Sequence, residues 1–201
     1  MGLVTTGFSM SLDGFIALPN NEIGPLFDWM FMGDTNLAAP LGESEMELTV
    51  SSQSAEMLAE ATEAAGVLVT GRTLFDFTGG WGGRHPLDVP IVVVTHNVET
   101  VAEEWRRDGA IFTFVTDGVE GAIARAQEIA GEKKVVIASA NVLQQCIRAG
   151  LVDEIHIDLV PVLLGEGIRM FDHLGSDQIK LETPAVVEAA GVTHLTYRII
   201  K

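Results

Sequence analysis

Three short segments of the chain carry the side chains best suited to hold a phosphate group: Thr70-Gly71-Arg72-Thr73, Thr95-His96-Asn97 and Ala138-Ser139-Ala140-Asn141. Each follows an apolar run and precedes a segment with helical spacing, so each is predicted to be a turn from a strand into a helix. The start of a helix offers free backbone N–H groups, and hydroxyls or a basic side chain add further phosphate ligands. Capping of the helix by small polar residues is the alternative interpretation of any single turn.

The elements around these turns alternate between strand and helix. Short apolar strands are expected at residues 67–70, 91–95, 111–116 and 135–137, with helical segments between them, most clearly at about 119–130. Such alternation predicts right-handed crossovers and a parallel sheet covered on both faces. Ligands bind at the carboxyl ends of the strands in such sheets, so three turns of this kind on one edge favour a nucleotide.

The first strand, at residues 3–10, leads into the polar break Ser11-Leu12-Asp13-Gly14 and resumes briefly at residues 15–17. Asp13 therefore follows an apolar strand, where its carboxylate is placed to face the ligand crevice. An Asp followed by Gly is equally typical of an Asx turn, in which the carboxylate stabilises the backbone. The spacing leaves these two interpretations equal.

The last third of the chain has a different pattern. Residues 154–162 alternate with Ile155, Ile157 and Leu159 on one face, and two further strands near residues 179–188 and 193–200 flank Gly191 with no helix between them. Those strands are expected to be antiparallel. The sequence thus predicts one α/β domain over residues 1–201, in three layers, with a mixed, mostly parallel sheet, helices on both faces and antiparallel C-terminal strands.

Other segments are less regular. Residues 19–45 show no clean period and contain several aromatic residues, so a long loop that acts as a lid or an interface is expected. Trp81 lies among four glycines, which favours a mobile flap slightly over a plain surface loop. Thr100 and Glu103 have the spacing of a capping box, and Ser139 or Asn141 is expected to cap the helix that Gly150 ends.

Composition excludes several classes of function. The chain has 12 basic and 28 acidic residues and a net charge of −16, which argues against binding to nucleic acid or to an anionic membrane surface. Cys146 is the only cysteine, so neither a disulfide nor a cysteine-based zinc site forms within one chain. No apolar run is long enough for a membrane helix, and a cytoplasmic location is expected. Only His156 and Asp158 have ligand-like spacing, so no metal site is predicted.

Four segments together resemble a known family. SLDGFIA at residues 11–17, TGRTLF at 70–75, PIVVVTH at 90–96 and AGLVDEIHIDLVPVLLGEGIRMF at 149–171 are similar, in order and spacing, to the dihydrofolate-reductase-like family. Within that family they resemble the reductase domain of the bifunctional riboflavin-biosynthesis deaminase/reductase. The last segment is long and specific, whereas each of the others is weak alone. The deaminase domain, with its zinc ligands, has no counterpart here.

The resemblance implies an NADPH-dependent reductase of a small heterocyclic substrate, commonly a homodimer. The riboflavin-pathway ribosylaminopyrimidine is the family's candidate substrate, and a folate reductase or a nucleotide-binding protein without turnover are the alternatives. The cofactor site that the resemblance and the three turns together predict comprises Ala17, Thr70, Gly71, Arg72, Thr73, Thr95, His96, Ser139, Ala140 and Asn141. Ala17 would lie near the nicotinamide, and Thr95 and His96 near the adenosine 2′-phosphate. Asp13 would face the substrate and Glu154 would support the site.

One departure from the family pattern concerns the cofactor. The family often has two glycines where this chain has Ala138-Ser139. Glycines allow the backbone to approach a pyrophosphate closely, so replacement of the glycine pair is expected to affect the affinity for the cofactor.

Overall fold

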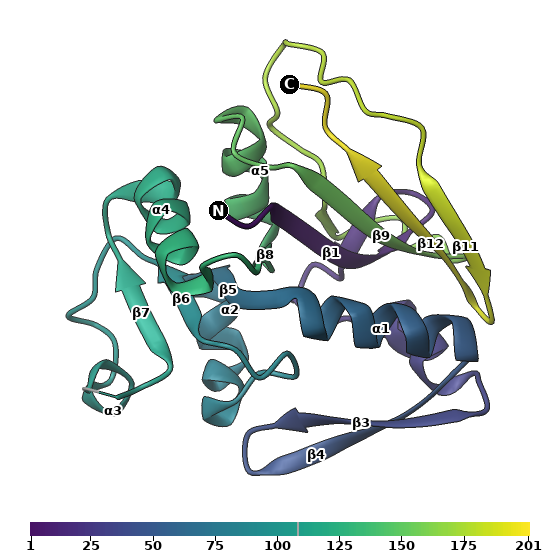
Figure 1. The fold of residues 1–201 in the computed structure, drawn as a ribbon, viewed down its shortest axis with the longest axis horizontal. Coiled ribbons are helices and arrows are strands. Elements are labelled where there is room, and N and C mark those ends of the chain that lie inside the picture. The colour runs from purple at the N-terminus through teal and green to yellow at the C-terminus, as the bar shows by residue number, and fades with distance from the viewer. Residues whose placement is uncertain (108) are drawn as a thin grey trace.

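An eight-stranded sheet organises the chain (Figure 1). The computed structural model describes residues 1–107 and 109–201. Across the sheet the strands follow the order β11 (Ala185–Ala189), β12 (Val192–Arg198), β9 (Glu154–Val160), β1 (Val4–Ser11), β8 (Lys134–Ile137), β5 (Ala65–Gly71), β6 (Ile91–Val94) and β7 (Phe112–Val115). The N-terminal strand β1 thus lies in the middle of the sheet, between two strands from the C-terminal half.

Strand directions confirm the predicted fold class. Six strands, from β9 to β7, are parallel to their neighbours, whereas β12 runs antiparallel to β9 and β11 antiparallel to β12. Strands β5 and β6 are apolar runs buried on both faces, which is the composition that covered parallel sheets require, whereas β1 and β9 alternate apolar and polar residues. The final two strands form a hairpin at Gly191, whose φ of 73° suits a tight turn.

Helices cover both faces of the sheet (Figure 1). On one face, α4 (Gly118–Ala130) and α5 (Ala140–Arg148) pack apolar side chains against Val67, Val69 and Ile137. On the other, α2 (Arg72–Phe77) places Phe75 against Leu68, and α1 (Ser52–Ala64) packs beside a second apolar cluster. Within the residues that the structure describes, no helix has the length and apolar character needed to cross a membrane.

The segment predicted as a long loop is structured, so that prediction is wrong for most of residues 19–45. It contains the 3₁₀ helix η1 (Gly24–Phe31) and the hairpin of β3 (Thr35–Leu41) and β4 (Ser44–Val50). Pro40, which in the sequence indicated an interruption of regular structure, is tolerated in β3 because β3 is an edge strand, where some residues need no N–H to pair with a neighbouring strand. Leu26 and Trp29 of η1 are buried in an apolar cluster with Leu48 of β4, whereas Phe31 is 58% exposed, so part of the aromatic stretch forms core.

Other boundaries also differ from expectation. The helix α3 (Glu103–Arg106) has Ala102 at its N-cap with no side-chain cap, so Thr100 does not form the predicted capping box. The strand expected near residues 179–188 begins only at Ala185, preceded by one isolated bridge between Leu181 and Ile199. Short β2 (Phe15–Ala17) pairs with β10 (Ile168–Arg169), which ties the break after β1 to the later chain.

The glycine-rich segment forms the 3₁₀ turn η2 (Gly79–Gly83) with left-handed backbone. Residues 79–82 have φ between 51° and 63°, and Trp81 is the one non-glycine among them. The Trp81 ring meets the His85 ring edge-on, with centroids 4.9 Å apart. The N–H of Gly42, in the β3–β4 turn, donates to the Arg84 carbonyl at 3.0 Å, so this segment is held against the hairpin.

Burial of His85 makes the η2 segment sensitive to acid. Burial lowers the pKa of His85 to about 4, whereas the pKa of a histidine in the unfolded chain is about 6.5. The unfolded state therefore binds the proton first, and stability is expected to fall as pH drops from about 6.5 to 4. We expect the Tm of His85→Gln to decline less over this pH range than the Tm of the wild type. His96→Gln, which alters an exposed histidine, is the control, and equal slopes for His85→Gln and wild type would contradict the prediction.

Candidate functional site

The fold brings the three predicted phosphate-type turns to one edge. Strand β5 lies between β8 and β6, all three are parallel, and the turns follow their carboxyl ends at Gly71, Val94 and Ile137. Neighbouring strands lie about 4.8 Å apart, so the turns are adjacent in space. The sequence-based expectation that they would lie side by side is therefore met.

Ser139 links two of these turns directly. Its Oγ accepts the Gly71 N–H at 2.8 Å and lies 2.9 Å from Thr70 Oγ1, with Thr70 and Ser139 both buried. Ser139 occupies the N-cap of α5, but its side chain makes no capping bond, because the hydroxyl is used across the sheet edge instead. Ala140 is half-buried in the first turn of α5, and Asn141 beside it is exposed and accepts a bond from Gln145. The residues that replace the family's glycine pair thus fill the space beside Gly71.

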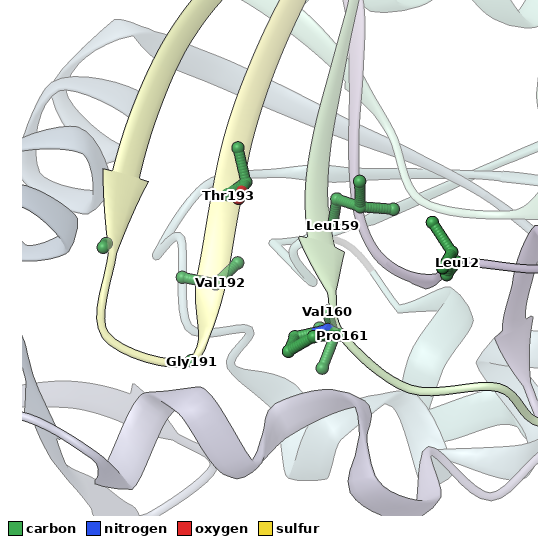
Figure 2. Close-up of a pocket in the computed structure, with 8 residues that line it drawn as sticks. Leu12, Leu159, Val160, Pro161, Gly191, Val192 and Thr193 are labelled. Atoms are coloured by element: carbon green, nitrogen blue, oxygen red, sulfur yellow. The ribbon is translucent and has the colours of Figure 1, made fainter.

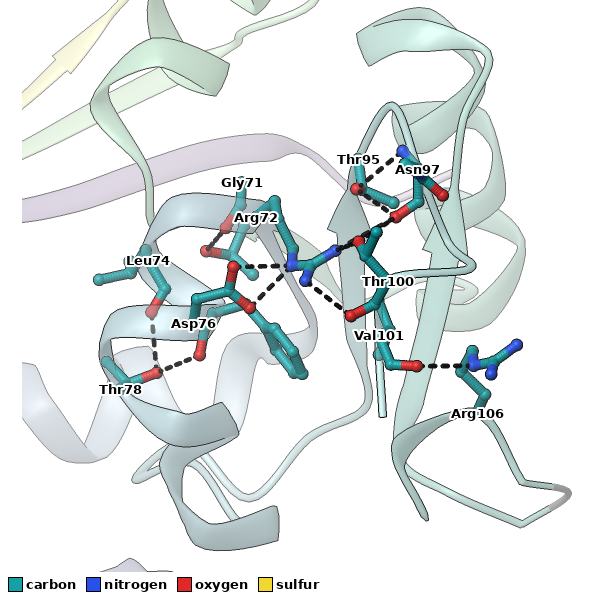
Figure 3. Close-up of polar contacts among 12 residues, drawn as sticks. Gly71, Arg72, Leu74, Asp76, Thr78, Thr95, Asn97, Thr100, Val101 and Arg106 are labelled. Atoms are coloured by element: carbon teal, nitrogen blue, oxygen red, sulfur yellow. Dashed lines mark hydrogen bonds and ion pairs between the residues drawn. The ribbon is translucent and has the colours of Figure 1, made fainter. Parts of the chain in front are cut away.

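Arg72 connects the turn after β5 with the loop after β6 (Figure 3). Its Nε donates to the Asp76 carboxylate at 2.7 Å, and its Nη1 donates to Thr100 Oγ1 at 2.9 Å and to the Asn97 carbonyl at 3.2 Å. The side chain remains 25% exposed. Arg72 therefore presents a fixed guanidinium at the sheet edge, with part of its charge balanced by Asp76.

The loop after β6 is closed by a short hydroxyl turn. Thr95 is buried and its Oγ1 accepts the Asn97 N–H at 3.3 Å. His96, between them, is exposed. Thr73, on the other side of Arg72, is exposed in the first turn of α2. This edge therefore offers hydroxyls, one guanidinium and one imidazole to a ligand.

Asp13 lies at the neighbouring carboxyl end, after β1, and its carboxylate is fully engaged. It accepts the Ser11 hydroxyl at 2.6 Å and the backbone N–H groups of Gly165 at 2.7 Å and Leu164 at 3.1 Å. The Ser11 hydrogen bond lowers the pKa of Asp13 to about 2, against the effect of burial and with help from the two N–H groups. The carboxylate joins the turn after β1 to the loop after β9.

Ala17 and Arg169 complete this joint. Ala17 pairs with Ile168 in the small β2–β10 sheet, and a Cβ on Gly167 would collide with the Ala17 carbonyl oxygen. The Arg169 guanidinium lies over the Phe15 ring at 4.5 Å and donates to the Asp13 carbonyl at 3.3 Å. The position of Ala17 is thus fixed by contacts to residues more than 150 positions later in the chain.

Glu154 does not join these residues, which corrects its expected place in the site. It begins β9, six residues before Val160, and so lies about 20 Å along the strand from the carboxyl edge. Its carboxylate binds Lys134 at 2.7 Å and Arg198 at 3.3 Å. Burial alone would raise the pKa of Glu154, but the hydrogen bond and charge of Lys134 bring it below its usual value. Glu154 is the buried member of an ion-pair network at the amino edge of the sheet, in which the Arg198 side chain is 66% exposed.

The sequence analysis missed a polar face of the sheet around Gly7. The pairing of β1 with β8 ends at Thr6 and Ile137, whereas its pairing with β9 continues to Ser11 and Val160. Gly7 lies just beyond the end of the β8 pairing and is exposed. The polar side chains on this face, which the period of two along β9 does indicate, are Ser9, Glu154, His156, Asp158 and His194.

His156 and Asp158 share this face, as their spacing indicates, but they serve different partners. His156 Nδ1 lies 3.0 Å from Thr196 Oγ1, and Asp158 Oδ1 lies 2.7 Å from His194 Nδ1. Burial and the Lys134 charge lower the pKa of His156. Over residues 1–107 and 109–201, no group of three or more potential ligand side chains is placed to hold a metal ion.

A pocket of about 290 Å³ lies elsewhere, where β9 ends and β12 begins (Figure 2). Its lining is apolar apart from Thr193 and includes Leu12, Leu159, Val160, Pro161 and Val192. It contains no charged side chain to bind phosphate and none of the predicted cofactor residues. The geometry therefore favours the turns after β5, β6 and β8 as the anion site.

The three acceptor bonds of Asp13 predict a pH-dependent stabilisation. Because the folded-state pKa is about 2 and the unfolded value about 3.9, this stabilisation is complete above pH 4 and lost as pH falls towards 2. Asp13→Asn retains one acceptor oxygen, so we expect a lower Tm than wild type at pH 7 and a smaller difference near pH 2.5. Asp172→Asn, at an exposed carboxylate, is the control. A constant Tm difference between pH 7 and 2.5 would contradict this account.

Comparison with known proteins agrees with the geometry. A family model described as the RibD C-terminal domain matches residues 3–195. Comparison with curated protein sequences finds no match. Among solved structures, a Shewanella sp. PV-4 protein described as a riboflavin biosynthesis protein is 22% identical, with a TM-score of 0.70 and 99% of each chain covered.

Two further structures share the fold. Acinetobacter baumannii RibD is 15% identical, with a TM-score of 0.68, and this chain is fully covered but spans only 58% of the RibD chain. Dihydrofolate reductase from Enterococcus faecalis, complexed with NADP(H) and RAB-propyl, is 17% identical, with a TM-score of 0.59 and 98% of its chain covered. These likenesses establish a dihydrofolate-reductase-like fold.

Proposed function

Because the chain belongs to the RibD C-terminal domain family, we propose that it is an oxidoreductase that reduces a small heterocyclic substrate with NADPH. The observation that carries the proposal is the placement of two strand-to-helix turns and the loop after β6, with their hydroxyls and Arg72, on one edge of a dihydrofolate-reductase-like sheet. The proposed substrate is 5-amino-6-(5-phosphoribosylamino)uracil, the riboflavin-pathway intermediate that the family resemblance implies. NADPH, when bound, supplies the hydride.

The residues at this edge fit a phosphate-bearing cofactor. A Cβ on Gly71 would make ordinary contacts, 3.4 Å from Val142 Cγ2 and 3.6 Å from Ser139 Oγ, so the turn after β5 lies directly beside the start of α5. Gly71, Thr73 and the first turn of α2 would hold the phosphates that both nucleotides share, and Arg72, Thr95 and His96 would lie towards the 2′-phosphate. The chain's charge of −16 repels a polyanion, so binding depends on these local groups.

One observation favours a second candidate, a nucleotide-binding protein without turnover. Ser139 Oγ uses the Gly71 N–H, which would otherwise be available to a phosphate. A folate reductase is the remaining alternative within the same fold. These three candidate functions are separated by following NADPH absorbance in three reactions: with the aminopyrimidine, with dihydrofolate, and with neither substrate. Oxidation with the aminopyrimidine supports the proposal, whereas tight NADPH binding without oxidation supports the second candidate.

The fixed guanidinium of Arg72 predicts a preference for NADPH over NADH. A charge-assisted hydrogen bond to the 2′-phosphate contributes about 1.5–3 kcal/mol, or roughly tenfold to a hundredfold in Kd. We expect Arg72→Met to weaken NADPH binding by that factor and to leave NADH binding nearly unchanged. Arg84→Met is a matched control, because Arg84 also pairs with an aspartate four residues later, Asp88, but lies outside the site. Equal losses for both nucleotides would contradict the role of Arg72.

A homodimer is also proposed, on the family likeness. Leu195, Tyr197 and Ile199, near the C-terminus, are partly buried apolar residues that pack against the main core. Apolar side chains with a greater exposed fraction lie at the carboxyl edge, where Leu12 is 64% and Leu163 is 68% exposed. Light scattering at micromolar concentration is expected to give twice the mass of 21.5 kDa. A monomer mass would end this proposal.

A further inference from the structure

An exposed glycine lies in the middle of the large sheet. Strand β1 has three strands on one side and four on the other, yet Gly7 within it is open to solvent. A Cβ on Gly7 would have one atom other than its chain neighbours within 4 Å, His156 Cβ at 3.8 Å. The sheet face that carries Ser9, His156 and Asp158 is therefore uncovered at this point, and a flat molecule can lie against the β1 backbone.

Asp158 stands at the border of this open face and is held by a buried pair. Its Oδ1 lies 2.7 Å from His194 Nδ1, and His194 Nε2 lies 2.8 Å from Ser54 Oγ, in the first turn of α1. The His194 side chain is 2% exposed and Ser54 is 1% exposed, whereas the Asp158 side chain is 27% exposed. The buried part of this chain thus fixes a carboxylate whose other end reaches solvent.

The imidazole itself has little freedom. The Trp29 ring meets the His194 ring edge-on at 5.3 Å, and Trp29 Nε1 donates to Ser9 Oγ at 3.0 Å. Because Ser9 is paired with Asp158 across β1 and β9, Trp29, Ser9, Asp158 and His194 form one packed row. The orientation of Asp158 is therefore set by four different elements, η1, β1, β12 and α1.

The two carboxylates that the sequence singled out, Asp13 and Glu154, are already used. Asp13 accepts three hydrogen bonds, and Glu154 lies in an ion-pair network at the far edge. Asp158, in contrast, has only the His194 bond among the residues that the structure describes. Its Oδ2 is left to accept a hydrogen bond from a molecule above Gly7.

We propose that Asp158 binds the substrate by accepting an N–H of its heterocycle, which lies on Gly7, and that His194 and Ser54 are positioning residues for Asp158. The inference rests on the proposed reductase function and deepens it. The ligand class that fits is a planar heterocycle with N–H donors, because one anionic oxygen beside an open backbone strand recognises a donor and a flat face. The heterocycle need not carry a positive charge, because a neutral N–H can donate to the Asp158 carboxylate.

The first experiment measures binding of 5-amino-6-(5-phosphoribosylamino)uracil by titration calorimetry, with saturating NADP⁺. Loss of a charge-assisted bond in Asp158→Asn is expected to weaken probe binding by about tenfold to a hundredfold. Gly7→Val fills the open face and is expected to abolish probe binding while the Tm stays equal or rises. Asp153→Asn is the matched control, because the Asp153 side chain is 26% exposed but binds Val4 and Lys201 outside this face.

The second experiment separates positioning from packing at His194. Asn at this position keeps an amide N–H near the place of Nδ1, so His194→Asn is expected to retain most of the probe affinity. His194→Leu has a similar volume but no donor, and is expected to lose about tenfold in probe affinity with unchanged NADP⁺ binding. A packing role alone predicts the reverse order, since Leu suits the apolar contact with Trp29 and Asn does not.

The outcomes distinguish this inference from the proposed function. Failure of the wild type to bind NADP⁺ contradicts the reductase proposal and this inference with it. If the wild type binds NADP⁺ but not the probe, the proposed substrate and the role of Asp158 are both overturned, and the nucleotide site stands. If the wild type binds both and Asp158→Asn binds the probe as tightly, the role of Asp158 alone is overturned.

Discussion

One buried hydrogen bond marks the point on which the site depends. The Thr6 hydroxyl donates to the Ile137 carbonyl at 2.8 Å, at the last residue pair that β1 and β8 share. Beyond it β8 turns into Ala138 and Ser139, while β1 continues beside β9 as far as Ser11. This separation places the phosphate-type turns on one side and the open strand at Gly7 on the other. A ligand that uses both must lie across the point where the two strands part.

Electrostatics at this edge are governed by local pairing more than by net charge. Several cations of the chain are matched with carboxylates: Arg72 with Asp76, Arg84 with Asp88, and Lys134 and Arg198 with Glu154. Of these four cations, Arg72 is the one that lies at the candidate site. An anion must therefore be attracted by oriented N–H groups and by the remaining donors of a fixed guanidinium. Such an arrangement binds through geometry, and it weakens as salt screens the exposed charge.

Local patterns in the sequence predicted the parallel part of the fold well. The change from a short apolar run to helical spacing marks the turns after β5 and β8, and a polar segment marks the end of β6. The β3–β4 hairpin was missed, since Pro40 and Gly42 indicate a loop until the hairpin's edge positions are known. The fold class followed from the order of the elements, whereas their exact boundaries depended on tertiary contacts.

The candidate site was less predictable because its decisive bonds join residues far apart in sequence. Asp13 is bound by N–H groups 151 and 152 positions later, and Ser54 meets His194 across 140 positions. Spacing alone left Asp13 equally suited to a turn and to catalysis, and it gave Asp158 no role beyond a weak metal-ligand pattern. Only the paired register of β1, β9 and β12 brings Asp158 beside an exposed glycine.

The most direct test of this account is a crystal structure with NADP⁺ bound. The account predicts phosphate groups within hydrogen-bonding distance of the turns at Gly71 to Thr73 and Thr95 to His96, with the nicotinamide directed towards Ala17 and the backbone at Gly7 left open. Cofactor ordered instead in the apolar pocket between Leu12 and Thr193, or at the amino edge beside Glu154, would contradict it.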